Sequence, residues 1–270
     1  MFLIANNIST REAKVERILR QAESAGWDIE SEPARMLKSL VKQCLDGGAD
    51  ALEINTQQHD DRPEAMEFAV RVAQQVTDGQ LCLSTNNAET LKAGLKACRR
   101  PPLANYVSPN GERLQEMLLA VARYGAGVIL LVSDPVVASD AREMLQKTAI
   151  LVGAANEVGI PNGSILVDPG LIHITGDAGQ RHMVEVFQFL RALPDVTEPA
   201  VKSTCWLANC SAGAPPRSRP VIETALLSML AGAGLSSVFL NVLRPQNRRI
   251  ARLIKIFNNE LIYSDSEVES

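Results

Sequence analysis

The stretch LCLSTNNAETLKAGLKACRR, from Leu81 to Arg100, contains the unit from which the fold can be predicted. It begins with a short apolar run, passes through small neutral polar residues, and continues with apolar residues at helical spacing. Seven further short apolar runs lie along the chain: FLIANN from Phe2, ALEIN from Ala51, LANY from Leu103, VILLVSD from Val128, ILVDP from Ile165, STCWLANCS from Ser203 and SVFLN from Ser237. Amphipathic segments separate these runs, and several of the segments close on glycine, as helices often do. Apolar runs that alternate with helices indicate a parallel sheet, and eight such units in about 250 residues predict an α/β protein with a (β/α)8 TIM barrel.

We expect one barrel domain over residues 1–263 and a polar, acidic tail over residues 264–270. Two segments exceed the minimal repeating unit. The segment from Arg11 to Gly26 has apolar residues on one helical face and predicts an extra helix after the first strand. The segment from Pro169 to His182 predicts a long loop after the sixth strand, and loops of this length in a compact domain are often functional.

The composition excludes several classes of function. The net charge is -4 with 27 basic and 31 acidic residues scattered along the chain, so no basic surface for nucleic acid is expected. The five cysteines show no disulfide spacing and favour a reducing, cytoplasmic location. The N-terminus has only a four-residue apolar stretch, and no window approaches about 18 apolar residues, so neither secretion nor a membrane span is expected.

Polar side chains follow the last apolar position of the predicted strands. In a parallel barrel the carboxyl ends of the strands converge on one face, where substrates bind. Asn or Asp stands at or near each of these ends: the residues are Asn6 and Asn7, Asn55, Asn86 and Asn87, Asn105, Asp134, Asp168, Asn209 and Asn241. The pattern predicts a binding face rich in amides.

Amide side chains at one face suit a flat, neutral, nitrogen-rich ring. An amide offers donors and an acceptor in one plane, and a buried carboxylate can accept two N–H bonds from an amidine-like edge. A phosphate ligand would instead call for a glycine-rich cradle, and no such motif occurs. A sugar would usually require stacking aromatics, which are only 4% of the chain. A pterin is the better match.

Some of these residues have a structural explanation, because Asn and Asp are favoured at helix N-caps. Asp134 before Pro135, Asn86 three residues before Glu89, and Asn110 after Pro109 are interpreted as caps. Asn55, Asn105, Asp168, Asn209 and Asn241 stand on strand ends before a loop, which favours a ligand-binding role.

The colinear set ALEIN, LCLSTNNAETLKAGLKACRR, ILVDP, LANCS and SRPVIETALLSMLAGAG resembles the methyltetrahydrofolate:corrinoid/iron–sulfur protein methyltransferases. These enzymes are part of the pterin-binding barrel superfamily that also includes dihydropteroate synthase. The resemblance extends from the first strand to the last helix. It implies a methyltransferase that moves the methyl group of methyltetrahydrofolate to or from the cobalt of a corrinoid on a separate protein, and that works as a homodimer with no permanently bound cofactor and no metal.

The resemblance also implies roles for single residues. Asp168 and Asn105 match pterin-binding residues, and Asn209 matches the mobile Asn that reaches the methyl-bearing nitrogen and is catalytic. Asn241 stands where the family has an Asp, and Lys202 has a counterpart near the pterin pocket. Asn55 and Ser84, at the second and third strand ends, complete the expected pterin-binding set.

Three departures from the family pattern bear on this interpretation. The family's third strand ends Asp-Ser-Thr-Asn, whereas Ser84 here follows Leu83 directly, so one carboxylate is missing. Loss of a charge-assisted hydrogen bond costs about 1.5–3 kcal/mol unless another group compensates. Trp206 replaces a family Gly and is interpreted as a residue that fills part of the pocket as its wall, or that stacks on the bound ring. Near the N-terminus ANNIS, from Ala5, replaces the family's Gly-Glu-Arg-Ile-Asn.

These departures leave two alternatives to the methyltransferase. One is a catalytically weakened paralogue that binds a pterin or a corrinoid protein without transferring the methyl group. The other is an enzyme with the same fold and a different methyl donor. The basic helix RPQNRRIARLIK, from Arg244, is interpreted as a solvated face, with docking of an acidic corrinoid protein as the alternative. His173 and His182 are interpreted as exposed histidines of the long loop.

Overall fold

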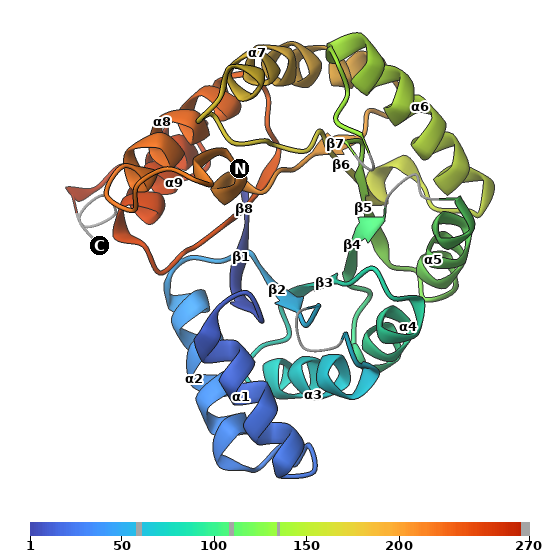
Figure 1. Ribbon diagram of the computed structural model, residues 1–270, viewed down its shortest axis with the longest axis vertical. Coiled ribbons are helices and arrows are strands. Elements are labelled where there is room, and N and C mark those ends of the chain that lie inside the picture. The colour runs from blue at the N-terminus through green and yellow to red at the C-terminus, as the bar shows by residue number, and fades with distance from the viewer. Residues whose placement is uncertain (58–60, 108–110, 134–135, 266–270) are drawn as a thin grey trace.

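A computed structural model describes residues 1–57, 61–107, 111–133 and 136–265 of the chain. Eight parallel strands form one sheet that curves into a nearly closed barrel, and the helices surround it (Figure 1). The strands pair in the order β7-β6-β5-β4-β3-β2-β1-β8. Their bounds are β1 Phe2–Ser9, β2 Ala51–Asn55, β3 Gln80–Ser84, β4 Leu103–Val107, β5 Gly127–Leu131, β6 Ile165–Asp168, β7 Lys202–Ser203 and β8 Ser237–Leu240. The predicted (β/α)8 TIM barrel is confirmed.

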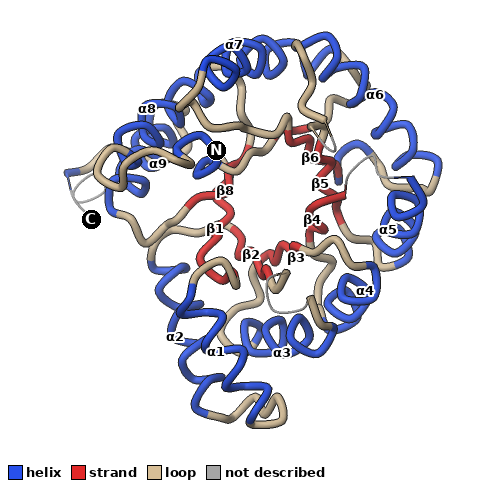
Figure 2. Tube along the Cα trace, viewed as in Figure 1, coloured by secondary structure: helices blue, strands red, loops and turns tan. Residues whose placement is uncertain are grey.

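The helices form an outer ring around the strands (Figure 2). The α-helices of the described residues are α1 Ala13–Ser24, α2 Glu32–Asp46, α3 Pro63–Gln74, α4 Ala88–Ala97, α5 Gly111–Arg123, α6 Ala141–Glu157, α7 Asp177–Ala192, α8 Arg219–Gly232 and α9 Pro245–Phe257. Within the same residues, the short 3-10 helices are η1 Asn162–Ser164, η2 Leu193–Asp195 and η3 Leu207–Ser211. α1 is the predicted extra helix and packs beside α2 outside the ring. Among the described residues, no helix combines the length and the apolar character that a membrane crossing requires.

The barrel core has an outer and an inner layer. Side chains of one strand face pack against the helices, as Leu52, Leu83 and Val167 do. Side chains of the other face fill the barrel interior and are Ile4, Ala51, Cys82, Ile129, Leu166, Trp206 and Phe239. Because strand side chains alternate between the two faces, the residues two and four positions after Ala51 must also point inward.

The sheet closes between β7 and β8 through a short region of pairing. The predicted seventh strand, which was expected to continue through Asn209, has only two residues in the sheet. Beyond it, Trp206 forms an isolated parallel bridge with Phe239, and the Phe239 N–H donates to the Cys205 carbonyl at 2.8 Å. The chain then turns into η3, so Asn209 lies on a 3-10 helix instead of a strand end.

Two local predictions are wrong, as the start of α4 and the start of α7 show. Asn87, and not Asn86, caps α4, because its Oδ1 accepts from the N–H groups of Glu89 and Thr90. His182 lies in α7 and is buried, because that helix already begins at Asp177 within the predicted loop. The predicted caps Asp134 and Asn110 lie outside the described residues.

Candidate functional site

Five polar side chains lie buried inside the barrel near the carboxyl ends of neighbouring strands. All are at most 5% exposed, and each stands an even number of residues after an inner-layer side chain on its strand, so it points into the barrel. They are Glu53 and Asn55 on β2, Ser84 on β3, Asn105 on β4 and Asp168 on β6. The register places Asn55 beside Ser84 and Ser84 beside Asn105. We call these five residues the inner polar group. The structure thus brings together four of the predicted pterin-binding residues.

Hydrogen bonds link members of the inner polar group in pairs. The Asn105 amide donates to the Ser84 hydroxyl at 2.9 Å. The Asn55 side-chain amide donates to Glu53 Oε1 at 3.2 Å, and Asn55 Oδ1 accepts from the Gln57 backbone N–H at 3.2 Å. The second carboxyl oxygen, Glu53 Oε2, is buried and has no hydrogen-bond partner within the described part of the chain. An acceptor of this kind can receive an N–H from a ligand.

Glu53 is the site residue that the sequence analysis missed. It stands within ALEIN, a run that was interpreted as an apolar strand ending in Asn55. Its alternation with Asn55 on the same strand face was the available signal, since residues two apart share a face. Burial raises the pKa of Glu53 to about 8, although the side chains of Ser84 and Asn55 and the charge of Arg11 act in the opposite direction. The carboxyl is therefore mostly protonated at neutral pH in the absence of a ligand.

Asp168 is fixed by the turn that follows β6. Gly170 has φ +76°, a conformation that favours glycine, and its N–H donates to Asp168 Oδ1 at 2.7 Å. A Cβ added at Gly170 would lie 2.6 Å from the Ser133 Cβ, so the close approach of the two loops also requires glycine. Burial raises the pKa of Asp168 to about 7, opposed by the Gly170 N–H bond. A modest change in surroundings is enough to ionise this carboxyl at neutral pH.

A second group of predicted residues lies at the β7–β8 side of the mouth. A cavity of about 160 Å³ is lined by Asn209, Asn241, Trp206, Arg11 and Arg244 among others. Asn241 Oδ1 accepts from the Asn7 side-chain amide at 2.7 Å, which ties β8 to β1. Asn209 is half-buried on η3. The predicted catalytic amide therefore opens onto a cavity and is held on a short irregular segment.

Trp206 lies in the barrel interior against Phe239 and Arg11. Its indole stacks on Phe239 with ring centroids 5.3 Å apart, and the Arg11 guanidinium carbon lies 4.8 Å from its ring centroid. The side chain is 6% exposed and belongs to the inner core layer, yet it also lines the β7–β8 cavity. The indole thus forms part of the cavity wall.

Two ion-paired side chains hold the segment that carries Asn209. Glu223 of α8 is buried and accepts from Arg244 at 2.9 and 3.1 Å. The Ser211 hydroxyl at the end of η3 donates to Glu223 Oε1 at 2.8 Å. Because a buried carboxylate requires such partners, this network fixes η3 against α8.

Lys202 does not join either group. It lies at the start of β7, in register with Leu166, and is exposed. Asp168 stands two residues beyond Leu166, toward the carboxyl end of the neighbouring strand. Lys202 therefore lies toward the amino-terminal ends of the strands, away from the carboxyl ends that carry the inner polar group.

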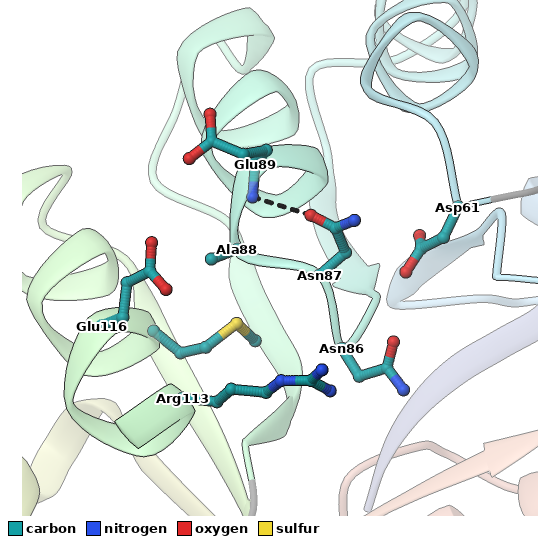
Figure 3. A pocket seen from close by; sticks show the side chains of 8 residues that line it. Asp61, Asn86, Asn87, Ala88, Glu89, Arg113 and Glu116 are labelled. Atoms are coloured by element: carbon teal, nitrogen blue, oxygen red, sulfur yellow. Dashed lines mark hydrogen bonds between the residues drawn. The ribbon is translucent and has the colours of Figure 1, made fainter.

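A larger cavity of about 350 Å³ opens at the mouth between α4 and α5 (Figure 3). It is lined by Asp61, Asn86, Asn87, Ala88, Glu89, Arg113, Glu116 and Met117. Arg113 extends from α5 toward Asn86, and the Asn87 cap bond to Glu89 is visible beside it. The Thr85 hydroxyl donates to the Asp61 carboxylate at 2.7 Å, so this wall is anchored one residue after Ser84. The volume of the cavity lies within the range of about 300–1,000 Å³ that is usual for small-molecule pockets.

Comparisons with known proteins add to this geometry. Residues 27–241 match the family described as pterin binding enzymes. Over 154 residues, or 53% of this chain, the sequence is 30% identical to a methionine synthase of Mycobacterium tuberculosis, and the match covers 13% of that protein's length. A crystal structure of dihydropteroate synthetase with a product superposes with a TM-score of 0.65 and 16% identity, covering 96% of this chain and 94% of the other. The Mycobacterium tuberculosis protein Rv1207 does so with a TM-score of 0.62 and 15% identity, covering 95% and 92%. The two structural likenesses concern the fold.

Proposed function

The chain belongs to the family of pterin-binding enzymes, and on that premise we propose that it moves the methyl group of 5-methyltetrahydrofolate to, or from, the cobalt of a protein-bound corrinoid. The observation that carries this proposal is the inner polar group, which buries amides and carboxyls inside the barrel mouth without a lysine or arginine among them. Such a set recognises a neutral ring with alternating donors and acceptors. The partial likeness to a methionine synthase supports methyl-group chemistry.

The inner polar group would bind the pterin by its edges. The Asp168 carboxylate accepts two N–H bonds from the amino-pyrimidine edge, which favours the ionised form of a carboxyl whose pKa is about 7 without ligand. Asn105, Ser84 and Asn55 complete the contacts along the adjoining edges. Asn241, on the β7–β8 side, faces the other part of the ring. Burial of the ring would exclude water from the reacting nitrogen.

Methyl transfer requires a proton at the leaving nitrogen. When the bond between N5 and the methyl carbon breaks, its electron pair stays on nitrogen, and the carbon bonds to the cobalt(I) through an electron pair of the metal. The tertiary amine leaves readily only when N5 is protonated, so the site must stabilise that N–H. Asn209 can accept from it with its side-chain oxygen, and a neutral amide stabilises only the activated form. A free cation beside N5 would oppose protonation, and the two arginines that line the Asn209 cavity have other partners: Arg244 is paired with Glu223, and Arg11 lies over the Trp206 ring.

The acceptor protein would dock over the open carboxyl face of the barrel, where the cavities lie. We propose a corrinoid protein, of the corrinoid/iron–sulfur kind or another, as the partner, and a homodimer as the working form. The reaction would take place in the cytoplasm, where the five free cysteines remain reduced.

Two features favour a second candidate, a pterin-binding paralogue with weakened catalysis. Ser84 removes the expected carboxylate at the third strand, and Trp206 occupies interior space. A same-fold methyltransferase with another donor is the third candidate. Each predicts a different result in one assay.

The assay follows reduced cobalamin spectroscopically under anaerobic conditions after addition of methyltetrahydrofolate and protein. We expect loss of the Co(I) absorbance at a rate that depends on the protein, because the methyl group leaves N5 for the metal. Asn209→Ala should slow this loss about 100- to 1,000-fold while pterin binding, measured by calorimetry, remains close to that of the wild type. Pterin binding without any Co(I) loss would favour the paralogue, and no binding of the pterin would favour a different donor.

A further inference from the structure

The strand next to Ser84 carries a carboxyl that has the properties of a ligand-binding group. Glu53 on β2 is fully buried, and its Oε1 accepts from Asn55, which is the register partner of Ser84. Its Oε2 has no hydrogen-bond partner among the described residues. The Ser84 side chain also stabilises the charged form of this carboxyl, but no donor among the described residues completes a hydrogen bond at Oε2, so Oε2 can accept from a ligand once the carboxyl is ionised.

We propose that Glu53 provides the second carboxyl that binds the pterin. This carboxyl lies on β2 instead of at the end of the neighbouring strand β3, and Ser84 and Asn105 are the neutral residues that contact the same edge of the ring. This inference rests on the proposed pterin-binding function and assigns a residue and a contact within it. It explains how a chain with serine at position 84 can still complete the hydrogen bonds of the ring.

The neighbours of Glu53 favour a ligand contact over a structural role. A structural buried carboxylate is normally paired with a cation or saturated with hydrogen bonds, as Glu223 is by Arg244 and Ser211. Glu53 instead accepts from the Asn55 amide at Oε1, the neutral Ser84 side chain also stabilises its charged form, and Oε2 completes no hydrogen bond in the described part of the chain. A buried carboxyl group that lacks part of its hydrogen bonds lowers the stability of the folded protein. Such groups are often found at ligand-binding sites.

The local chemistry also sets the charge state of Glu53. The titratable or charged groups that act on it are Cys82, its register partner on β3, and Arg11 beyond the β1 end. Cys82 is neutral, since burial and the Glu53 charge raise the pKa of its thiol well above the usual value. Because the pKa of Glu53 is about 8, the free protein holds a proton there at pH 7. Ring N–H donors would stabilise the carboxylate, so binding should release this proton.

The test compares wild-type protein with Glu53→Gln, which keeps the shape of the side chain, cannot ionise, and replaces one acceptor oxygen with an NH2 donor. Methyltetrahydrofolate is titrated calorimetrically at pH 7 in two buffers of different ionisation enthalpy, which yields both the affinity and the number of protons released. We expect Glu53→Gln to bind about 10- to 100-fold more weakly and to release fewer protons than the wild type. Glu53→Asp, which retains the carboxyl but withdraws it, serves as the second variant, and thermal unfolding of each variant checks that the barrel is intact.

A rescue makes the assignment specific. Ser84→Asp in the Glu53→Gln background returns a carboxylate to the end of β3 and should restore most of the lost affinity. Equal affinity and equal proton release for wild type and Glu53→Gln would overturn the role of Glu53 and leave the pterin site standing. Absence of binding by the wild type would overturn the proposed function and this inference with it.

Discussion

Asp168 and Glu53 show at the residue scale how burial prepares a carboxyl for a ligand. Each is held inside the barrel by a hydrogen-bond donor from the protein, the Gly170 N–H for Asp168 and the Asn55 amide for Glu53. Burial raises the pKa of Asp168 to about 7 and that of Glu53 to about 8. A group with a pKa near neutrality gains or loses its charge in response to a modest change in surroundings, which suits recognition of a ring with N–H donors.

The raised pKa of Asp168 predicts a pH dependence of stability. Between its usual pKa of 3.8 and its folded value of about 7, the folded chain binds more protons here than the unfolded chain does. The free energy of unfolding therefore falls as pH rises through this window. Asp168→Asn keeps an acceptor for Gly170 but removes the ionisation, so its stability should fall less between pH 4 and pH 8. Denaturant unfolding at a series of pH values measures the difference, and parallel curves for the two proteins would contradict a raised pKa.

The sequence predicted most of the inner polar group but not all of it. Asn55, Asn105 and Asp168 were identified because each stands at a visible strand end. Glu53 was missed because the sequence does not show which side chains surround an acidic residue inside an apolar run. Its spacing of two from Asn55 did indicate that both side chains lie on the same face of the strand. Lys202 was carried over from the family resemblance, and the exposed position at the start of β7 could not be inferred without the length of that strand.

β7 and η3 form the element on which the catalytic proposal depends. The strand leaves the sheet after two residues, and the closure then depends on the bridge between Trp206 and Phe239. The apolar run from Ser203 predicted a longer strand because apolar content alone does not distinguish a strand from a buried 3-10 turn. The irregular segment places Asn209 over a cavity instead of in the sheet.

Trp206→Ala should lower the free energy of unfolding by about 3–5 kcal/mol, because it deletes a buried indole from the closure of the barrel. The substitution removes both the stacking of the indole on Phe239 and its cation–π interaction with Arg11. Pterin affinity should survive the change, since the 6% exposed indole is already covered by these partners. Urea unfolding measures the loss of stability, and Trp27→Ala, which deletes an indole that packs on Phe68 outside the barrel, is the control. A loss of affinity larger than that of the control would show that Trp206 contacts the ring directly.

At the scale of the whole molecule, eight strand and helix units were readable from the sequence because each strand is a short apolar run followed by a helical pattern. The parallel order of the sheet follows from that alternation. The convergence of distant residues was also predictable, since the carboxyl ends of all strands meet on one face. The division of that face into two groups of residues could not be predicted, because it depends on side-chain packing. The inner polar group lies on β2, β3, β4 and β6, and the cavity that Asn209 lines lies between β8, β1 and η3.

The central claim is that the barrel binds a reduced pterin through buried polar side chains, and calorimetric titration of methyltetrahydrofolate into wild type and Asp168→Asn tests it most directly. At pH 8 the Asp168 carboxyl, with a pKa of about 7, is mostly ionised, so the full charge-assisted contact is present in the wild type alone. We expect saturable one-to-one binding by the wild type and at least about 10-fold weaker binding by Asp168→Asn. No heat of binding with the wild type, or equal affinities for the two proteins, would contradict it.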